Sequence, residues 1–140
     1  MRTGLAPPTA GNDATDRAAV EAIGRDVVDS AFHVHAELGP GLLESAYEHC
    51  LIHELTSRGV PVERQVQVPV HYKDTRIDAG FRLDLLVAGR VIVEIKSVEK
   101  LMPIHQAQMM TYLRLTGCRL GFLVNFNTKL FKDGLKRVVM

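Results

Sequence analysis

Three charged side chains stand within apolar segments near the middle of the sequence. Asp84 lies inside the segment 81–87, and Glu94 and Lys96 lie toward the end of the segment 91–97. Glu94 and Lys96 are two residues apart, so on a strand their side chains leave the same face. A short hairpin turn between the two segments would bring Asp84 beside them. We therefore expect one acidic cluster with a lysine next to it.

Such a cluster is suited to binding a divalent cation. Charged groups near the centre of an apolar sheet are costly unless they pair or bind a cation. Two carboxylates and the carbonyl of Ile95 offer oxygen ligands, which suit Mg²⁺ or Mn²⁺. The cluster also follows a buried strand and precedes a helix, where open α/β sheets favour ligand sites. An ordinary hairpin with a cross-strand ion pair from Lys96 to Asp84 or Glu94 explains the same spacing.

Two helical segments carry further candidates. Glu44, in Gly41-x-x-Glu44-x-x-Tyr47, lies at the margin of an apolar helix face and can reach inward; the alternative is a first-turn acid favoured by the helix dipole. Gln108 and Tyr112 are one helical turn apart and can project together toward the sheet. There they would bond a phosphate, a ligand water or the lysine; the alternative is simple packing of an amphipathic pair.

The elements that position these residues follow from periodicity and from Gly and Pro breakers. The pattern predicts the order α-α-β-β-β-α-β: a helix that starts between Asp13 and Asp16 and runs to Leu38, a helix over 42–58, strands over 62–70, 81–87 and 91–97, a helix over 103–117, and a strand over 119–125. A helix between two apolar strands indicates a right-handed crossover with those strands parallel. Residues 127–140 are left as a turn, a strand or a basic fringe. We expect a flexible tail over 1–15 and a single α/β domain over 16–140.

The amino-acid composition limits the classes of protein to which this chain can belong. The chain has 140 residues, 46% of them hydrophobic and 24% charged, which excludes wholesale disorder, collagen-like repeats and coiled coils. A net charge of +1 argues against nucleic-acid binding through one large basic surface, but not against a small acidic site fringed by basic residues. Cys50 and Cys118 match no metal-ligand spacing and are predicted to be buried free thiols. With no apolar stretch of membrane-spanning length and no signal-like amino terminus, we expect a cytoplasmic protein without membrane contact.

The residues singled out above resemble the core of the PD-(D/E)XK nuclease superfamily: Asp84, Glu94-Ile95-Lys96 and, as in its RecB-like nucleases, Gln108-x-x-x-Tyr112. Gly41-x-x-Glu44-x-x-Tyr47 matches the signature of the small GxxExxY protein family, which is assigned to that superfamily. Further matching segments are 95–101, 111–113, 125–127 and 132–134, so the resemblance covers residues 20–139. The sequence departs from the pattern at Leu83, where the superfamily name has Pro; that position provides no ligand.

The resemblance implies a restriction-endonuclease-like core, with a mixed central β-sheet flanked by helices, and a nuclease that depends on Mg²⁺ or Mn²⁺. Asp84 and Glu94 would ligate the metal together with the Ile95 carbonyl, and Lys96 would orient the attacking water or stabilise negative charge. Glu44 would be an additional acidic ligand, directly or through water. The expected function is hydrolysis of DNA or RNA, with a homodimer as an option. The alternatives are a nucleic-acid- or protein-binding module that does not cleave, and a structural subunit with a vestigial site.

Overall fold

The computed structural model describes residues 13–140, and most of the predicted tail lies outside them. Helix α1 begins at Asp13, ahead of the predicted domain boundary at Asp16. The described chain forms one five-stranded sheet in the order β1-β2-β3-β4-β5. The elements are α1 (Asp13–Leu38), α2 (Glu44–Ser57), β1 (Val62–Tyr72), β2 (Thr75–Val87), β3 (Val91–Lys96), α3 (Pro103–Thr116), β4 (Leu120–Asn125), α4 (Phe131–Gly134) and β5 (Leu135–Val139).

The sheet is mixed, as predicted. β3 and β4 run parallel, joined by the crossover helix α3, while the other neighbouring pairs are antiparallel. Pro103 begins α3, where a missing N–H costs nothing, and Gly117 caps its end in the left-handed conformation (φ 76°). The predicted element order holds, with α4 and β5 added after it. The region left open over 127–140 therefore contributes an edge strand, whose Val138 is buried.

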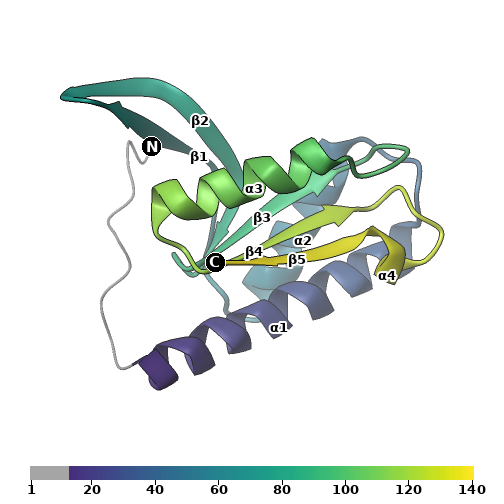
Figure 1. Ribbon diagram of the computed structural model, residues 1–140. Helices are drawn as coiled ribbons and strands as arrows, with labels where there is room; N and C mark the ends of the chain where they lie inside the picture. The colour runs from purple at the N-terminus through teal and green to yellow at the C-terminus, as the bar shows by residue number, and fades with distance from the viewer. Residues whose placement is uncertain (1–12) are drawn as a thin grey trace.

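Helices cover the sheet on both faces (Figure 1). α1 and α2 pack on one face, where the core contains Val27, Tyr47, Leu51, Val93 and Phe122. α3 packs on the other, where the core contains Leu86, Ile92, Met109, Leu113 and Leu123. Fully burying an aliphatic or aromatic side chain of this size contributes roughly 1.5–3 kcal/mol, so the two layers hold the strands firmly in register.

The two core layers fix the faces of β3. Val93 and Ile95 point toward α1 and α2, whereas Ile92 points toward α3. Because side chains alternate along a strand, Glu94 and Lys96 lie on the α3 face. Gly121 on β4 lets α3 approach closely there, since a Cβ at this position would collide with the Met109 sulfur.

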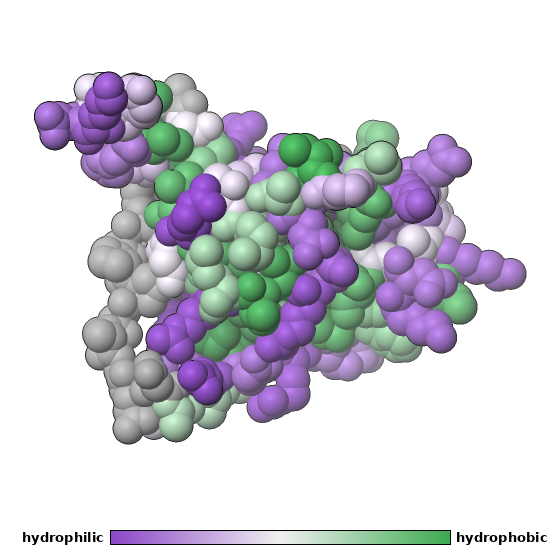
Figure 2. All heavy atoms as spheres, in the orientation of Figure 1, coloured by the Kyte–Doolittle hydropathy of each residue, from purple (hydrophilic) through white to green (hydrophobic). Residues whose placement is uncertain are grey.

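The β1–β2 hairpin is longer than predicted and projects from the body (Figure 1). Only Leu85–Val87 of β2 pair with β3, so the outer part of β2 pairs with β1 alone. The register shifts between Val68 and Val70, at Pro69, and Gly80 faces this irregularity because a Cβ there would strike Val70. The projecting end is hydrophilic (Figure 2). A strand segment without a core face lacks the apolar alternation that the prediction relied on, which explains the predicted start at residue 81.

Two further expectations can be compared with the structure. Both cysteines are free; Cys118 is buried as predicted, whereas Cys50 is half-buried. Within residues 13–140, no helix combines the length and the apolar character that crossing a membrane requires.

Candidate active site

The structure brings Asp84 of β2 and Glu94 of β3 together on the α3 face of the sheet. The paired register of these strands runs from Val87 to Leu85 on β2, so Asp84 and Glu94 follow directly. Beyond this paired register, the backbone N–H groups bond to side-chain carboxylates and no longer to the backbone of the neighbouring strand. The Ile95 N–H donates to Asp84 Oδ2 at 2.8 Å, and the Asp84 N–H donates to Glu94 Oε2 at 3.4 Å. The two carboxylates are thus fixed by each other's strands.

Glu94 is the most perturbed group at this site. Its side chain is buried, and Oε1 has no hydrogen-bond partner. Burial is the largest cause, and together with the hydrogen bond and the negative charge of the neighbouring Asp84 carboxylate it raises the pKa of Glu94 to about 10, against a smaller opposing effect of Lys96. In the metal-free protein Glu94 therefore carries a proton at neutral pH.

This pair fits a divalent cation. A buried carboxylate oxygen without a partner, beside a second carboxylate, is the arrangement that a hard cation would satisfy. Among residues 13–140, no three or more His, Cys, Asp or Glu side chains gather as a metal-binding group. Two carboxylates with a backbone carbonyl suit Mg²⁺, which keeps several of its own waters as ligands. The oxygen donors of Asp84, Glu94 and the Ile95 carbonyl are thus compatible in type with such an ion.

Lys96 shares the strand face of Glu94 and is half-buried at the end of β3. Its positive charge lowers the pKa of Glu94, which places it near the carboxylates. Within the described part of the chain it nevertheless forms no salt bridge with either of them at 4.0 Å or less. The alternative of a simple cross-strand ion pair is therefore wrong for this hairpin, and the ammonium group is left for another anion.

Helix α3 contributes Tyr112 but leaves Gln108 outside the cluster. The Tyr112 ring stacks on Phe81 of β2, with centroids 4.5 Å apart and planes 4° from parallel. Burial raises the pKa of Tyr112, and the charges of Glu94 and Asp84 add to this. Gln108, one turn earlier, is exposed and makes no hydrogen bond with another described residue.

Glu44 contacts the backbone that follows Lys96. It is the first residue of α2 and is exposed, and its Oε2 accepts a hydrogen bond from the Ser97 N–H at 3.0 Å. The neighbouring acid Glu48 is the buried one: its two oxygens accept from Arg64 Nε at 3.0 Å and from Gln65 Nε2 at 2.9 Å. Sequence reasoning missed Glu48, although its position one residue after Tyr47 and three before Leu51 places it on the helix face that packs inward.

Two further side chains that sequence reasoning left without a role hold loops near the site: Asn125 holds the loop after β3, and Tyr47 holds the loop between α1 and α2. Asn125, buried at the end of β4, accepts from the Val98 N–H at 3.1 Å and donates to the Val98 carbonyl at 3.0 Å. Tyr47 donates its hydroxyl to the Gly39 carbonyl at 2.6 Å and accepts from the Leu42 N–H at 3.1 Å. The sequence signal that could have identified Asn125 is its place as a polar residue at the end of an apolar strand.

Comparison with known proteins agrees with this geometry. Residues 21–138 match the PD-(D/E)XK nuclease superfamily, a span that contains every candidate site residue. Neither curated proteins nor solved structures gave a match. The match confirms the predicted restriction-endonuclease-like fold, whereas membership of the GxxExxY family stays a prediction. With a matched region covering most of its length, the chain belongs to the PD-(D/E)XK nuclease superfamily.

Proposed function

We propose that this chain is a divalent-metal-dependent nuclease that hydrolyses phosphodiester bonds of DNA or RNA. The observation that carries the proposal is the partnerless, buried Oε1 of Glu94 beside Asp84. A carboxylate pair that holds a proton in the absence of metal can bind a cation in place of that proton. Superfamily membership supports a nuclease-like function and a nucleic-acid substrate.

Each residue of the candidate site would have a separate role in this reaction. Asp84, Glu94 and the Ile95 carbonyl would hold Mg²⁺ or Mn²⁺. When bound, such an ion lowers the pKa of a water molecule and offsets phosphodiester charge. Lys96, close to the carboxylates but in no salt bridge with them, would stabilise negative charge on the phosphate or orient the attacking water.

Helix α3 would complete the substrate side of the site. The charges of both carboxylates raise the pKa of Tyr112, whose hydroxyl would donate a hydrogen bond to a phosphate oxygen or to a ligand water. Gln108 is exposed one turn away and would reach the substrate rather than the protein. The stacking of Tyr112 on Phe81 fixes the ring, so little side-chain entropy would be lost when a substrate binds.

The test is cleavage by the full chain of single- and double-stranded DNA and RNA, each with Mg²⁺, Mn²⁺ or EDTA. Asp84→Asn removes a ligand charge and should abolish cleavage, whereas Asp133→Asn removes an exposed charge on α4 and should not. Absence of metal-dependent cleavage of all four substrates would overturn the proposal. Wild-type cleavage by Asp84→Asn would trace the activity to a contaminant.

A second candidate is a module on the same fold that binds nucleic acid or a protein without cutting. The observation that favours it is the net charge of +1, since a balanced surface provides little electrostatic steering toward nucleic acid. Salt-dependent binding without turnover in the assay above would support this candidate over the nuclease.

We further propose a cytoplasmic location and a homodimeric assembly. Two free cysteines, Cys50 and Cys118, suit the reducing cytoplasm. A homodimer would let two such sites address both strands of a duplex; sedimentation equilibrium of the full chain measures it directly.

A further inference from the structure

The peptide unit between Lys96 and Ser97 is held from both sides of β3. The Lys96 carbonyl accepts a hydrogen bond from the Phe126 N–H at 3.0 Å, on the β4 side. On the opposite side, the Ser97 N–H donates to Glu44 Oε2, also at 3.0 Å. Both polar atoms of this one peptide are therefore fixed, directly after the α-carbon that carries the candidate catalytic lysine.

Two carboxylates occupy successive N–H groups on the same edge of β3. Backbone N–H groups two residues apart point to the same side of a strand, so those of Ile95 and Ser97 share an edge. The Ile95 N–H donates a hydrogen bond to Asp84 Oδ2 at 2.8 Å, and the Ser97 N–H donates one to Glu44 Oε2 at 3.0 Å. Where β2 no longer pairs with β3, acids from β2 and α2 replace it as partners and bracket Lys96.

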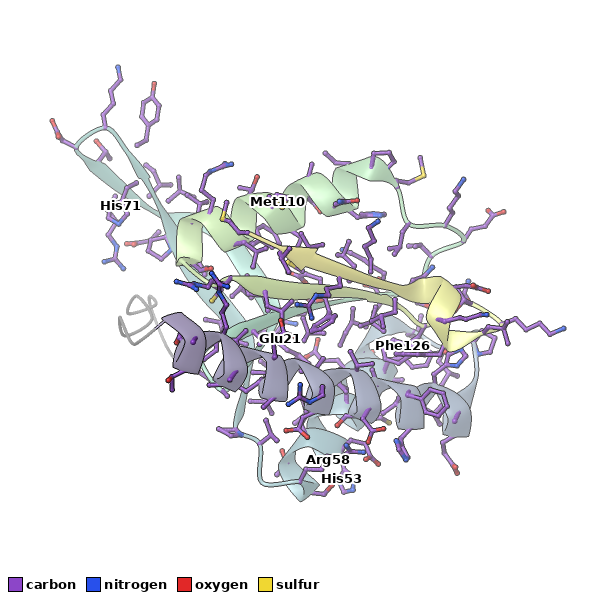
Figure 3. All side chains as sticks on the ribbon, turned by 60° about the horizontal axis from the view of Figure 1, so that its bottom comes forward. Glu21, His53, Arg58, His71, Met110 and Phe126 are labelled. Atoms are coloured by element: carbon purple, nitrogen blue, oxygen red, sulfur yellow. The ribbon has the colours of Figure 1, made fainter. Side chains whose placement is uncertain are left out.

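The Glu44 contact is anchored by a second set of bonds. The Ser97 hydroxyl donates to the Leu42 carbonyl at 2.6 Å, and Tyr47 ties the same loop through Gly39 and Leu42. The Tyr47 ring also stacks on Phe126, with centroids 4.4 Å apart and planes 6° from parallel. Figure 3 shows Phe126 on the α1 side of the sheet, opposite the layer that holds Met110. The start of α2 and the end of β3 thus form one rigid junction.

We infer that Glu44 is a positioning residue for Lys96 and not a metal ligand. Its hydrogen-bond partner is the backbone N–H of Ser97, and no third acidic side chain joins Asp84 and Glu94 within residues 13–140. Glu44 lies in the first turn of α2, where a negative charge is favourable for the helix dipole, but its hydrogen bond goes to the Ser97 N–H. By fixing the Lys96–Ser97 peptide it fixes the direction in which the lysine leaves the strand. This inference rests on the proposed function for the role of Lys96.

The experiment compares Glu44→Gln with Glu44→Ala in the full chain. An amide oxygen still accepts from the Ser97 N–H but is a poor ligand for a hard cation, so the two roles separate. Glu54→Gln, which removes a charge at the far end of the same helix where Glu54 pairs with Arg58 at 3.8 Å, is the matched control. Three quantities are measured: kcat at saturating Mn²⁺, the Mn²⁺ concentration for half-maximal effect, and the exchange rate of the Ser97 amide by NMR.

A positioning role predicts that Glu44→Gln keeps kcat within about threefold and leaves the Mn²⁺ requirement unchanged, as for the control, with Ser97 exchange faster than in the wild type but slower than in Glu44→Ala because a neutral hydrogen bond remains. Glu44→Ala should lower kcat by roughly ten- to a hundredfold, since a misplacement of about 1 Å costs on that order. Its Ser97 amide should exchange at least about tenfold faster, because a hydrogen bond to a charged group is lost. The Mn²⁺ requirement should not change.

The opposite pattern overturns the inference. If Glu44→Gln is as impaired as Glu44→Ala and the Mn²⁺ requirement rises about tenfold or more, Glu44 is a ligand. Unchanged Ser97 exchange in Glu44→Ala would also contradict it. If the wild-type chain cleaves nothing, the proposed nuclease function fails by itself, while Mn²⁺ titration and Ser97 exchange in Glu44→Gln still decide the role of Glu44.

Discussion

Replacing Glu94 by Gln should stabilise the metal-free protein at neutral and alkaline pH. The raised pKa of about 10 means that the folded chain keeps the Glu94 proton over a range in which the unfolded chain, with the ordinary value of 4.5, has lost it. The unfolded state then binds fewer protons, so stability falls as pH rises from about 4.5 toward 10. Gln is neutral and nearly the same shape, so it removes this dependence.

The expected effect is large on the scale of a small domain. Each pH unit between the two pKa values lowers the free energy of unfolding by up to about 1.4 kcal/mol. Between pH 5 and pH 8 the wild-type chain should lose up to about 4 kcal/mol from this group, a sizeable part of the total stability of 5–15 kcal/mol that is typical of proteins. The free energy of unfolding of Glu94→Gln should fall less between pH 5 and pH 8, by the same amount.

Urea unfolding in EDTA at several pH values between 5 and 8.5 measures the difference. Glu37→Gln, which removes an exposed acid from α1, controls for the loss of one charge. Mn²⁺ should stabilise the wild-type chain more at pH 8 than at pH 6, because binding requires the ionised carboxylate and releases its proton. Equal pH slopes for wild type and Glu94→Gln would refute the reasoning that burial beside Asp84 raises this pKa.

Two other contacts give independent predictions. Tyr47→Phe leaves the Gly39 carbonyl and the Leu42 N–H without their partner and should destabilise the chain by about 1–3 kcal/mol in urea, with Phe131→Tyr as a variant that leaves those bonds intact. Phe81→Ala removes the ring on which Tyr112 stacks and should cost about 1–3 kcal/mol, since Phe81 is half-buried. The same change should speed amide exchange in the projecting β1–β2 hairpin while leaving β4 protected; uniform acceleration in both would contradict the local anchoring of the hairpin.

Local sequence signals predicted the part of the fold that carries Asp84 and Glu94. The apolar run before Glu94 identifies a strand buried on both faces, and Pro103 and Gly117 bound the crossover helix within one residue of its observed ends. These signals are local, so the parallel pairing of β3 and β4 follows from them and from the handedness of crossovers. The outer hairpin could not be predicted in the same way, because a segment that packs on no core has no periodicity to show.

Long-range geometry decided what each acid does. Glu44 and Ser97 are 53 residues apart, and no periodic pattern links a helix start to the end of a particular strand. Sequence reasoning singled out Glu44 on α2 and missed Glu48, although both lie near the apolar stripe of that helix. The rotation of α2 against the sheet buries Glu48, which then pairs with Arg64, and leaves Glu44 to the loop.

The protonated state of Glu94 bears on whether this site is functional or vestigial. An acid that is buried beside another acid, with one oxygen unpartnered, lowers the stability of the folded chain at every pH where it would otherwise ionise. An apolar residue at the same position, next to Ile92 and Leu123 in the α3 layer, would remove that cost. Such a penalty is typical of a site whose ligand recovers it on binding, and a cation between Asp84 and Glu94 would do so. A vestigial site predicts no Mn²⁺-dependent rise in stability at pH 8; a working one predicts a rise that Glu94→Gln abolishes.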